Sequence, residues 1–348
     1  MNERERRADF GFEQAVMLSV VIPVYNEEES LAELYRELDE VAREYRYDVE
    51  ILFVDDGSTD GSWAQIKRLA DEDARVRGIR FRRNFGKAAA LSAGFREARG
   101  EFIFTLDADL QDDPHEMPRF LDQMQAGRDV ISGWKQVRHD PWHKVLPSRI
   151  FNWLVGRLTK VKLHDHNCGF KCYRREVLDE LQLYGEMHRF VPVLAAARGW
   201  RVDEIVVHHR ARRFGRSKYG FGRFVKGFLD LLTVHFLTGY GQRPQHLLGT
   251  LGLIAFLAGG LGVVVLTVWW FVSRWSPSIE PLHLHQRALF YYTLAAMLLG
   301  AQFLSVGFLA ELFTAYHMKE ARTYSIKERT DARSRDAQQA DREQQGTA

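Results

Sequence analysis

Residues 104–114 read FTLDADLQDDP, in which an apolar run stops at Asp107 and four carboxylates fall within seven residues. Acidic residues followed by proline are common in turns, because Asp bonds to its own backbone and Pro fixes its torsion. In an extended D-x-D, however, the carboxylates of Asp107 and Asp109 would lie on one side of the chain, about 6.5–7 Å apart at the backbone. Such a pair can face one hard cation, and Gln111, two residues after Asp109, adds a neutral oxygen on the same side of the chain. The stretch therefore predicts a strand that ends in a metal site.

The oxygen ligands also indicate which cation and which partner to expect. Mg²⁺ and Mn²⁺ favour oxygen, and Mg²⁺ is commonly shared between one or two carboxylates and the phosphates of a substrate. A phosphorylated partner is therefore expected at the end of this strand.

Outward from this stretch, short β-rich runs alternate with helical patterns such as residues 27–45 and 86–98. The runs are MLSVVIPV (17–24), EILFVDD (50–56), GIRFRR (78–83), EFIFTL (101–106) and DVIS (129–132). Alternation of this kind predicts a mostly parallel α/β sheet with helices on both faces. Ligands of such sheets bind beyond the carboxyl ends of the strands, where the polar clusters at 23–27, 55–58 and 107–109 would meet. The glycine patterns of dinucleotide-binding and P-loop enzymes do not occur, which disfavours both classes.

Two long runs, residues 247–272 and 288–310, contain no charged residue. At about 1.5 Å per residue, each is longer than the roughly 30 Å hydrocarbon core of a membrane. A buried helix of a soluble domain is the alternative for either run. Two such runs in tandem favour a transmembrane hairpin, with helices at about 247–272 and 288–311.

Basic residues cluster before the first span and after the second, whereas the connecting loop offers only Arg274 and Arg287. Positive charge stays on the cytoplasmic side, so both termini and the α/β domain are expected in the cytoplasm, at the plasma (inner) membrane. The N-terminal segment also has no apolar core like that of a signal peptide. The expected division is an N-terminal tail (1–16), a cytoplasmic domain (17–222), a juxtamembrane amphipathic helix (223–243), two transmembrane helices (244–315) and a cytoplasmic, mobile tail (316–348).

Residues 148–160 form an amphipathic pattern, with Phe151, Leu154, Val155 and Leu158 at i, i+3, i+4 and i+7. A helix packed in the core is one interpretation. Trp153 and the flanking cations favour a helix at the membrane interface, and residues 224–237 have the same character. Both helices could place the site at the depth of the lipid headgroups.

Four motifs, in this order and spacing, resemble the nucleotide-binding half of family 2 glycosyltransferases of the GT-A fold. They are VIPVYNEEESL, FVDDGSTDGS, RNFGKAAALSAGF and LDADLQDDP. Further on, DHNCGFKCYRREV and RFGRSKYGFGR resemble the polyprenyl-phosphate branch, which includes dolichol-phosphate mannose synthases and bacterial bactoprenol glucosyltransferases. The resemblance covers about residues 17–243. It implies a Rossmann-like catalytic sheet, a UDP- or GDP-linked sugar donor, a Mg²⁺ or Mn²⁺ cofactor and an undecaprenyl or dolichyl phosphate acceptor.

Carried over residue by residue, the resemblance implies a nucleotide site made of Pro23, Tyr25, Glu27, Asp55, Asp56, Lys87 and Asp107. Asp107 would approach the ribose and the metal, while Asp109 and Gln111 would hold the metal on the diphosphate. By themselves, residues 55–58 could be a strand-end turn and Lys87 a solvated lysine. The Q-x-x-R-W motif of processive members is absent. The nearest counterpart of that motif is GEMHRF (185–190). Two roles are open for its Glu186: a carboxylate on the acceptor side of the site, or a negative charge at a helix N-terminus.

The charge of the acceptor suggests how it would be bound. A lipid monophosphate, with a second pKa around 6, is already a nucleophile at neutral pH, so a catalytic base is dispensable. Bringing it toward an anionic donor calls for Arg and Lys. The candidates are Arg138, Ser148, Arg149, Arg213, Arg216, Ser217 and Lys218. Arg149 and Arg216 are expected to act in catalysis with Asp107 and Asp109. For any single arginine, attraction to the membrane surface or simple solvation is the alternative.

Taken together, these features predict an enzyme, an inverting, metal-dependent glycosyltransferase that moves one sugar from a nucleotide to polyprenyl phosphate at the cytoplasmic membrane face. A transferase that acts on another lipid, such as diacylglycerol, is one alternative. A non-catalytic membrane scaffold that binds nucleotide sugars is another. No nucleic acid is expected as a partner. Small residues in both spans predict that the spans pair with each other, and a homo-oligomer is the further expectation.

Overall fold

The computed structural model describes residues 17–136, 142–181, 187–210, 222–240, 243–275 and 283–317. The expected N-terminal tail and nearly all of the C-terminal tail lie outside these ranges.

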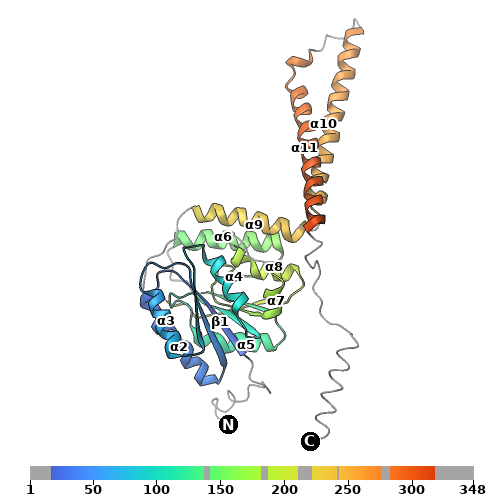
Figure 1. The fold of residues 1–348 in the computed structure, drawn as a ribbon. Coiled ribbons are helices and arrows are strands. Elements are labelled where there is room, and N and C mark those ends of the chain that lie inside the picture. Colours follow the sequence, from blue (N-terminus) through green and yellow to red (C-terminus); the bar gives the residue numbers. More distant parts are fainter. Residues whose placement is uncertain are drawn as a thin grey trace.

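A seven-stranded sheet in the order β3-β2-β1-β4-β6-β5-β7 forms the centre of the N-terminal domain (Figure 1). The strands are β1 (Met17–Val24), β2 (Asp48–Asp55), β3 (Val76–Arg80), β4 (Phe102–Thr105), β5 (Val130–Trp134), β6 (Lys171–Arg174) and β7 (Val202–Val206). Neighbouring strands pair in parallel except β6, which runs antiparallel to both β4 and β5. The first five strands overlap the predicted runs, although β3 ends at Arg80, before the end of the predicted run 78–83. The carboxyl ends of β1, β2 and β4 consequently share one edge of the sheet, as expected.

Helices cover both faces of this sheet. The elements of the domain are α2 (Glu28–Tyr45), α3 (Ser62–Glu72), α4 (Lys87–Glu97), η1 (Pro114–Glu116), α5 (Met117–Gln125), α7 (Arg175–Asp179), η2 (Met187–Phe190) and α8 (Val191–Ala197). One core packs side chains of α2, α3 and α5 against the sheet, such as Leu34, Ile66 and Phe120. The other packs α4, α7 and α8, with Leu91 and Val191 among its residues. Two separate cores explain why β1 is buried along most of its length.

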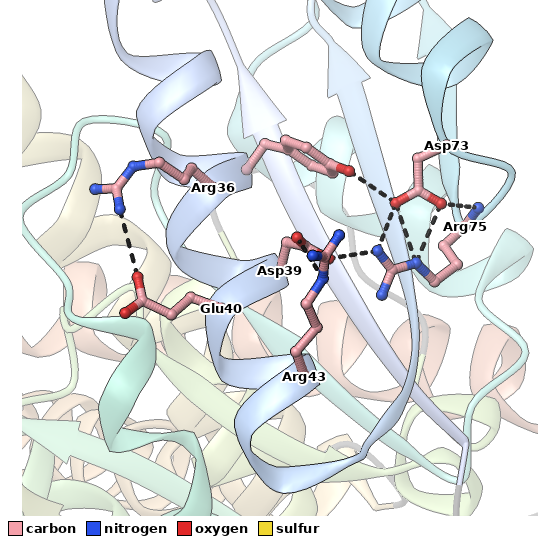
Figure 2. Close-up of polar contacts among 7 residues, drawn as sticks. Arg36, Asp39, Glu40, Arg43, Asp73 and Arg75 are labelled. Carbon is pink, nitrogen blue, oxygen red and sulfur yellow. Dashed lines mark hydrogen bonds and ion pairs between the residues drawn. The ribbon is translucent and has the colours of Figure 1, made fainter.

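An ion network fastens α2 to the turn that precedes β3 (Figure 2). The Arg75 guanidinium donates to Asp39 at 2.6 Å and to Asp73 at 2.7 and 3.0 Å. Asp73 also accepts the Tyr35 hydroxyl at 2.8 Å, and Arg43 pairs with Asp39 at 2.9 Å. Hydrogen bonds from Arg75, which outweigh partial burial, lower the pKa of Asp73 to about 2. Tyr35, Asp39, Arg43, Asp73 and Arg75 together form the α2–β3 network.

Helices α6 (Trp142–Thr159) and α9 (Gly222–Gly239) lie together across one end of the domain, next to the base of the hairpin (Figure 1). Their contact forms a third core with η2 and α8, in which Val155, Phe190 and Leu231 are completely buried. The apolar pattern of residues 148–160 therefore packs onto the domain, as the core-helix interpretation requires. The side that faces outward has a second apolar set. Its exposed members are Ile150, Trp153, Phe228, Leu229 and Leu232.

Helices α10 (Pro244–Trp275) and α11 (Ala288–His317), with η3 (Leu284–Gln286) before α11, form the hairpin that projects from the domain (Figure 1). Residues 244–275 and 288–314 are long and apolar enough to cross a membrane. Glycines allow the helices to approach, because a Cβ on Gly252 would lie 2.8 Å from the Gly300 carbonyl oxygen and one on Gly259 2.5 Å from the Met297 nitrogen. The predicted pairing of the two helices is confirmed, whereas a Cβ on Gly260 would meet no atom within 4 Å.

Candidate active site

Two of the predicted polar clusters are joined directly at the carboxyl edge of the sheet. The Asp56 N–H donates to the Val24 carbonyl at 2.8 Å, which connects the ends of β2 and β1. Asn26, in the left-handed region with φ 55, donates its N–H to Ser58 Oγ at 3.0 Å and accepts the Thr59 N–H at 2.8 Å. The chain then turns into α2. Pro23, Tyr25 and Glu27 thus lie beside residues 55–58, as the sequence predicts.

Both carboxylates of this cluster make structural bonds. Asp55 accepts the Ser58 N–H at 2.8 Å and pairs with Arg80 at 3.2 Å, which is the strand-end turn considered from sequence. Asp56 accepts the N–H groups of Phe85 and Gly86 at 2.7 and 2.9 Å. Burial raises the pKa of Asp56, while these two backbone bonds lower it. The Asp56 bonds fix the start of α4, whose first residue is Lys87.

Lys87 and Asp107 form an ion pair between α4 and the end of β4. Each side chain is about one third exposed, at 31% and 33%, so the pair lines an accessible surface. Partial desolvation would raise the pKa of Asp107, but the Lys87 ammonium holds it below its ordinary value. Lys87 is therefore paired with Asp107 at the edge of the sheet, rather than being a solvated surface lysine. A helix N-terminus with a lysine on its first turn also favours phosphate binding.

The segment from Asp107 to Gln111 does not have the extended geometry that its spacing suggested. Residues 108 and 109 lie in a turn, and Leu110 is left-handed at φ 60. Asp109 is 7% exposed and accepts the Gln111 N–H at 3.2 Å, a bond typical of Asp in turns. The expectation of an extended D-x-D is wrong because this local bond competes successfully with the strand. Asp107, Asp109 and Gln111 nevertheless lie on one short loop at the sheet edge.

The remaining two carboxylates of the stretch hold the loop in place. Asp112, which is fully buried at its side chain, pairs with Lys135 at 2.7 Å. Asp113 accepts the His115 N–H at 3.1 Å, which caps η1, and it pairs with Arg210 at 2.8 Å. Asp112 and Asp113 thus anchor the loop, whereas Asp107 pairs with Lys87 and Asp109 accepts the Gln111 N–H.

Four basic residues that the sequence did not identify surround the same edge. The backbones of His209 and Asp112 pair in an isolated antiparallel β-bridge, and His209 Nε2 lies 3.5 Å from Gln111 Nε2. Lys135 follows β5, Lys171 begins β6, and His188 lies in η2. Burial lowers the pKa of His188 well below its ordinary value, and the nearby Lys87, Arg189 and Lys171 add to this effect. Lys171 and His188 belong to the DHNCGFKCYRREV and GEMHRF stretches, which were the only signal available for them.

The donor set of this loop suits a hard divalent cation. Carboxylate oxygens of Asp107 and Asp109 and the amide oxygen of Gln111 are ligands that Mg²⁺ and Mn²⁺ prefer. Within the ranges described, no three His, Cys, Asp or Glu side chains come together as a metal centre. A cation here would take further oxygens from a bound phosphate or water, which matches the incomplete protein cage that Mg²⁺ usually has.

Two of the seven predicted acceptor residues, Ser148 and Arg149, belong to the described part of the chain. Arg138, Arg213, Arg216, Ser217 and Lys218 lie outside the described residues, as does Glu186. Ser148 is half-buried and Arg149 is exposed, both on α6. Helix α6 contacts the loop that leads to β6 through Asn152, whose amide donates to the His164 carbonyl at 2.7 Å.

Comparison with known proteins identifies the family. The model of Glycosyl transferase family 2 matches residues 19–182. A dodecaprenyl-phosphate galacturonate synthase of Rhizobium johnstonii is 34% identical over 328 residues, which cover 92% of this chain and 95% of the relative. An undecaprenyl-phosphate 4-deoxy-4-formamido-L-arabinose transferase of Pseudomonas fluorescens is 37% identical over 297 residues, with 84% and 83% covered. The predicted resemblance to the polyprenyl-phosphate branch is confirmed by these relatives.

A solved structure supports the fold. Glucosyl-3-phosphoglycerate synthase from Mycobacterium tuberculosis, in complex with Mn²⁺ and UDP-glucose, superposes with a TM-score of 0.51 at 17% identity, over 63% of this chain and 79% of that one. The likeness confirms the expected GT-A α/β fold. The family model matches the part of the chain that contains the sheet, and a relative matches nearly the whole length of the chain. The chain therefore belongs to glycosyl transferase family 2.

Proposed function

We propose that this glycosyltransferase moves a single sugar from a nucleotide sugar, UDP- or GDP-linked, to polyprenyl phosphate, with inversion at the sugar and with Mg²⁺ or Mn²⁺. The observation that carries the proposal is the meeting of the Asp107–Gln111 loop with Lys87 at one sheet edge, in a domain capped by helices that lead into an apolar hairpin. The two curated relatives, both named for polyprenyl phosphates, support the same acceptor.

At the donor, Asp107, Asp109 and Gln111 would hold the cation, which stabilises negative charge on the leaving diphosphate. Lys87 would face the phosphates from the first turn of α4, where the helix dipole adds to its charge. Pro23, Tyr25, Glu27, Asp55 and Asp56 would line the nucleoside. The backbone bonds of Asp56 and the turn at Asp55 keep this side of the site rigid before the donor arrives.

At the acceptor, cationic side chains would replace a general base, because the phosphate monoester is already ionised at neutral pH. Arg149, exposed on α6, would bind the phosphate with Ser148 beside it. Arg138, Arg213, Arg216, Ser217 and Lys218 would complete the acceptor site from the segments on either side. Arginine suits this task because its planar fork binds two phosphate oxygens at once.

The outward apolar set on α6 and α9 supports a site at the membrane surface. Trp153 is 68% exposed, Ile150 58% and Leu229 56%, and α9 is followed by the hairpin. Side chains of this kind, flanked by cations, bury themselves in the headgroup region. The domain would therefore lie against the cytoplasmic face of the plasma (inner) membrane. Both termini would be cytoplasmic, the hairpin would span the bilayer twice, and a homo-oligomer would form through the spans.

The decisive experiment uses the purified full-length chain, Mn²⁺ and radiolabelled nucleotide sugars, with undecaprenyl phosphate or diacylglycerol as acceptor. We expect labelled lipid when undecaprenyl phosphate is the acceptor and none when diacylglycerol is. We also expect only one of the nucleotide sugars to serve as donor. Transfer to diacylglycerol alone would assign a different lipid acceptor. Tight nucleotide binding without transfer to either lipid would favour a non-catalytic scaffold.

A further inference from the structure

Gly169, just before the start of β6, lies opposite Asp107, just after the end of β4. The two strands are antiparallel, with Thr105 paired to Lys171, so the same register two residues further along places Asp107 across from Gly169. The Thr105 hydroxyl donates to the Gly169 carbonyl at 2.7 Å. The glycine is thus held at the back of the loop that carries Asp107 and Asp109.

Space, rather than backbone conformation, explains a glycine at this position. Gly169 is not among the described residues with positive φ, so its backbone could accept any side chain. A Cβ at residue 169, however, would lie 2.5 Å from Asp107 Oδ2, 2.7 Å from its Cγ and 2.9 Å from its Oδ1. Atoms in a packed interior do not approach so closely. The Asp107 carboxylate therefore occupies the volume that a side chain at residue 169 would take.

Contacts of the neighbouring residues hold the backbone around Gly169 in place. Lys171 Nζ donates to the carbonyls of both His166 and Cys168. Phe170 is completely buried, stacks on Phe120 with the ring centroids 4.4 Å apart, and accepts the Gly133 N–H at its carbonyl at 2.9 Å. With its neighbours anchored on both sides, an added methyl group at residue 169 would displace the Asp107 side chain.

We infer that Gly169 is a positioning residue, whose missing side chain places the Asp107 carboxylate where the cation and the nucleotide need it. This inference rests on the proposed function of Asp107. It assigns a role in donor binding to the DHNCGFKCYRREV stretch, which lies about sixty residues from the D-x-D in sequence.

The test is Gly169→Ala in the full-length protein, with Gly133→Ala as the matched control. A Cβ on Gly133 would crowd the same turn from the other side, at 2.9 Å from Cys168 Sγ and 3.1 Å from the Phe170 carbonyl oxygen, without meeting Asp107. The measurements are calorimetric binding of UDP and of GDP, each with and without Mn²⁺, and the midpoint of thermal unfolding. We expect Gly169→Ala to weaken Mn²⁺-dependent binding by at least about tenfold, the loss of one charge-assisted contact. Gly133→Ala should lower only the unfolding temperature.

Two further readouts separate positioning from general damage. The Mn²⁺ concentration for half-maximal binding at a fixed nucleotide concentration should rise for Gly169→Ala and stay unchanged for Gly133→Ala. Equal affinity losses in both variants, or an unchanged affinity in Gly169→Ala, would overturn the inference. Failure of the unmodified protein to bind either nucleotide with Mn²⁺ would instead count against the proposed function.

Discussion

Arg75 and Lys171 are both cations close to the sheet, but their surroundings differ sharply. Arg75 is 36% exposed at its side chain and pairs with two carboxylates, Asp39 and Asp73. Lys171 is 4% exposed, and its bonds in the described chain go to backbone carbonyls of the loop before β6. Hydrogen bonds to Asp73 raise the pKa of Arg75, whereas burial, helped by the nearby Lys87, lowers the pKa of Lys171.

The contrast is between charges that pair near water and charges that gather at the carboxyl edge of the sheet. In the α2–β3 network, each charge is neutralised by a neighbour and stays near water, so the network costs little and contributes modestly to stability. At the carboxyl edge, Lys87, Lys171 and His188 gather around Asp107, and desolvation opposes the charged forms of Asp107, Lys171 and His188. Clusters of shifted pKa values in this arrangement are typical of functional sites. The following substitutions test the distinction.

The largest effect should come from Lys135→Met, which removes one partner of a buried ion pair. Lys135 is 14% exposed at its side chain and Asp112 is fully buried, so the variant leaves an uncompensated carboxylate in the interior. The expected loss of stability is about 3–5 kcal/mol, measured as the unfolding temperature in detergent. The double variant Lys135→Met, Asp112→Asn should recover most of it. A double variant as unstable as the single one would show that the unpaired Asp112 carboxylate does not cause the loss of stability.

Asp109→Asn, or removal of divalent cations with EDTA, should lower turnover by at least about a hundredfold, as expected when a strong electrostatic contact to a leaving charge is lost. The rate of sugar transfer to undecaprenyl phosphate is the measurement. Asp73→Asn is the matched control, because it makes the same chemical change in the α2–β3 network and should leave turnover unchanged. Near-normal activity in metal-free buffer would refute the assignment of Asp109.

Arg149→Ala should raise the acceptor KM by about ten- to a hundredfold, since it removes a charge-assisted contact to phosphate worth roughly 1.5–3 kcal/mol. The donor Kd should not change. Arg157→Ala, exposed on the same helix, controls for attraction to the anionic membrane. Arg149→Lys keeps the charge but loses the planar fork. A normal acceptor KM in Arg149→Lys, or an equally raised acceptor KM in Arg157→Ala, would show that Arg149 only attracts the membrane.

The smallest effect concerns the α2–β3 network and its pH dependence. The folded pKa of Asp73 is about 2, below its ordinary 3.8, so the ionised form stabilises the protein above about pH 4. That contribution is lost as the pH falls from about 4 through 2. Because Arg75 is more than one third exposed, solvent screening limits the effect to about 1 kcal/mol. Thermal unfolding across this range should show a smaller acid-induced decrease for Asp73→Asn, and an identical decrease would contradict the pairing.

Much of the fold could be predicted from local patterns. The first five strands and the two spans follow from runs of apolar residues, because an apolar run specifies burial regardless of what covers it. Strands β6 and β7 were missed. KCYR and VDEIV are short and partly charged, and they become strands only because β4 and β5 offer them edges. The helix at 148–160 was found, but which of its two apolar sides packs inward depended on η2, α8 and α9.

The site shows the same division. Motif order was enough to select Asp107, Asp109 and Lys87, since each follows an apolar strand or opens a helix. The sequence could not show that Asp112 would form an ion pair with Lys135 and Asp113 one with Arg210.

By itself, the sequence determined the family, the parallel sheet, the hairpin and the carboxylates at the strand ends, because these depend on residue type and on spacing along the chain. The tertiary structure alone decided which charges are paired and which side chains share space. Lys87 meets Asp107 across two elements, and Gly169 leaves room for that same carboxylate from a third. Electrostatic energy and steric exclusion both depend on distances through space, and distances between residues remote in sequence exist only once the sheet has brought its strand ends together.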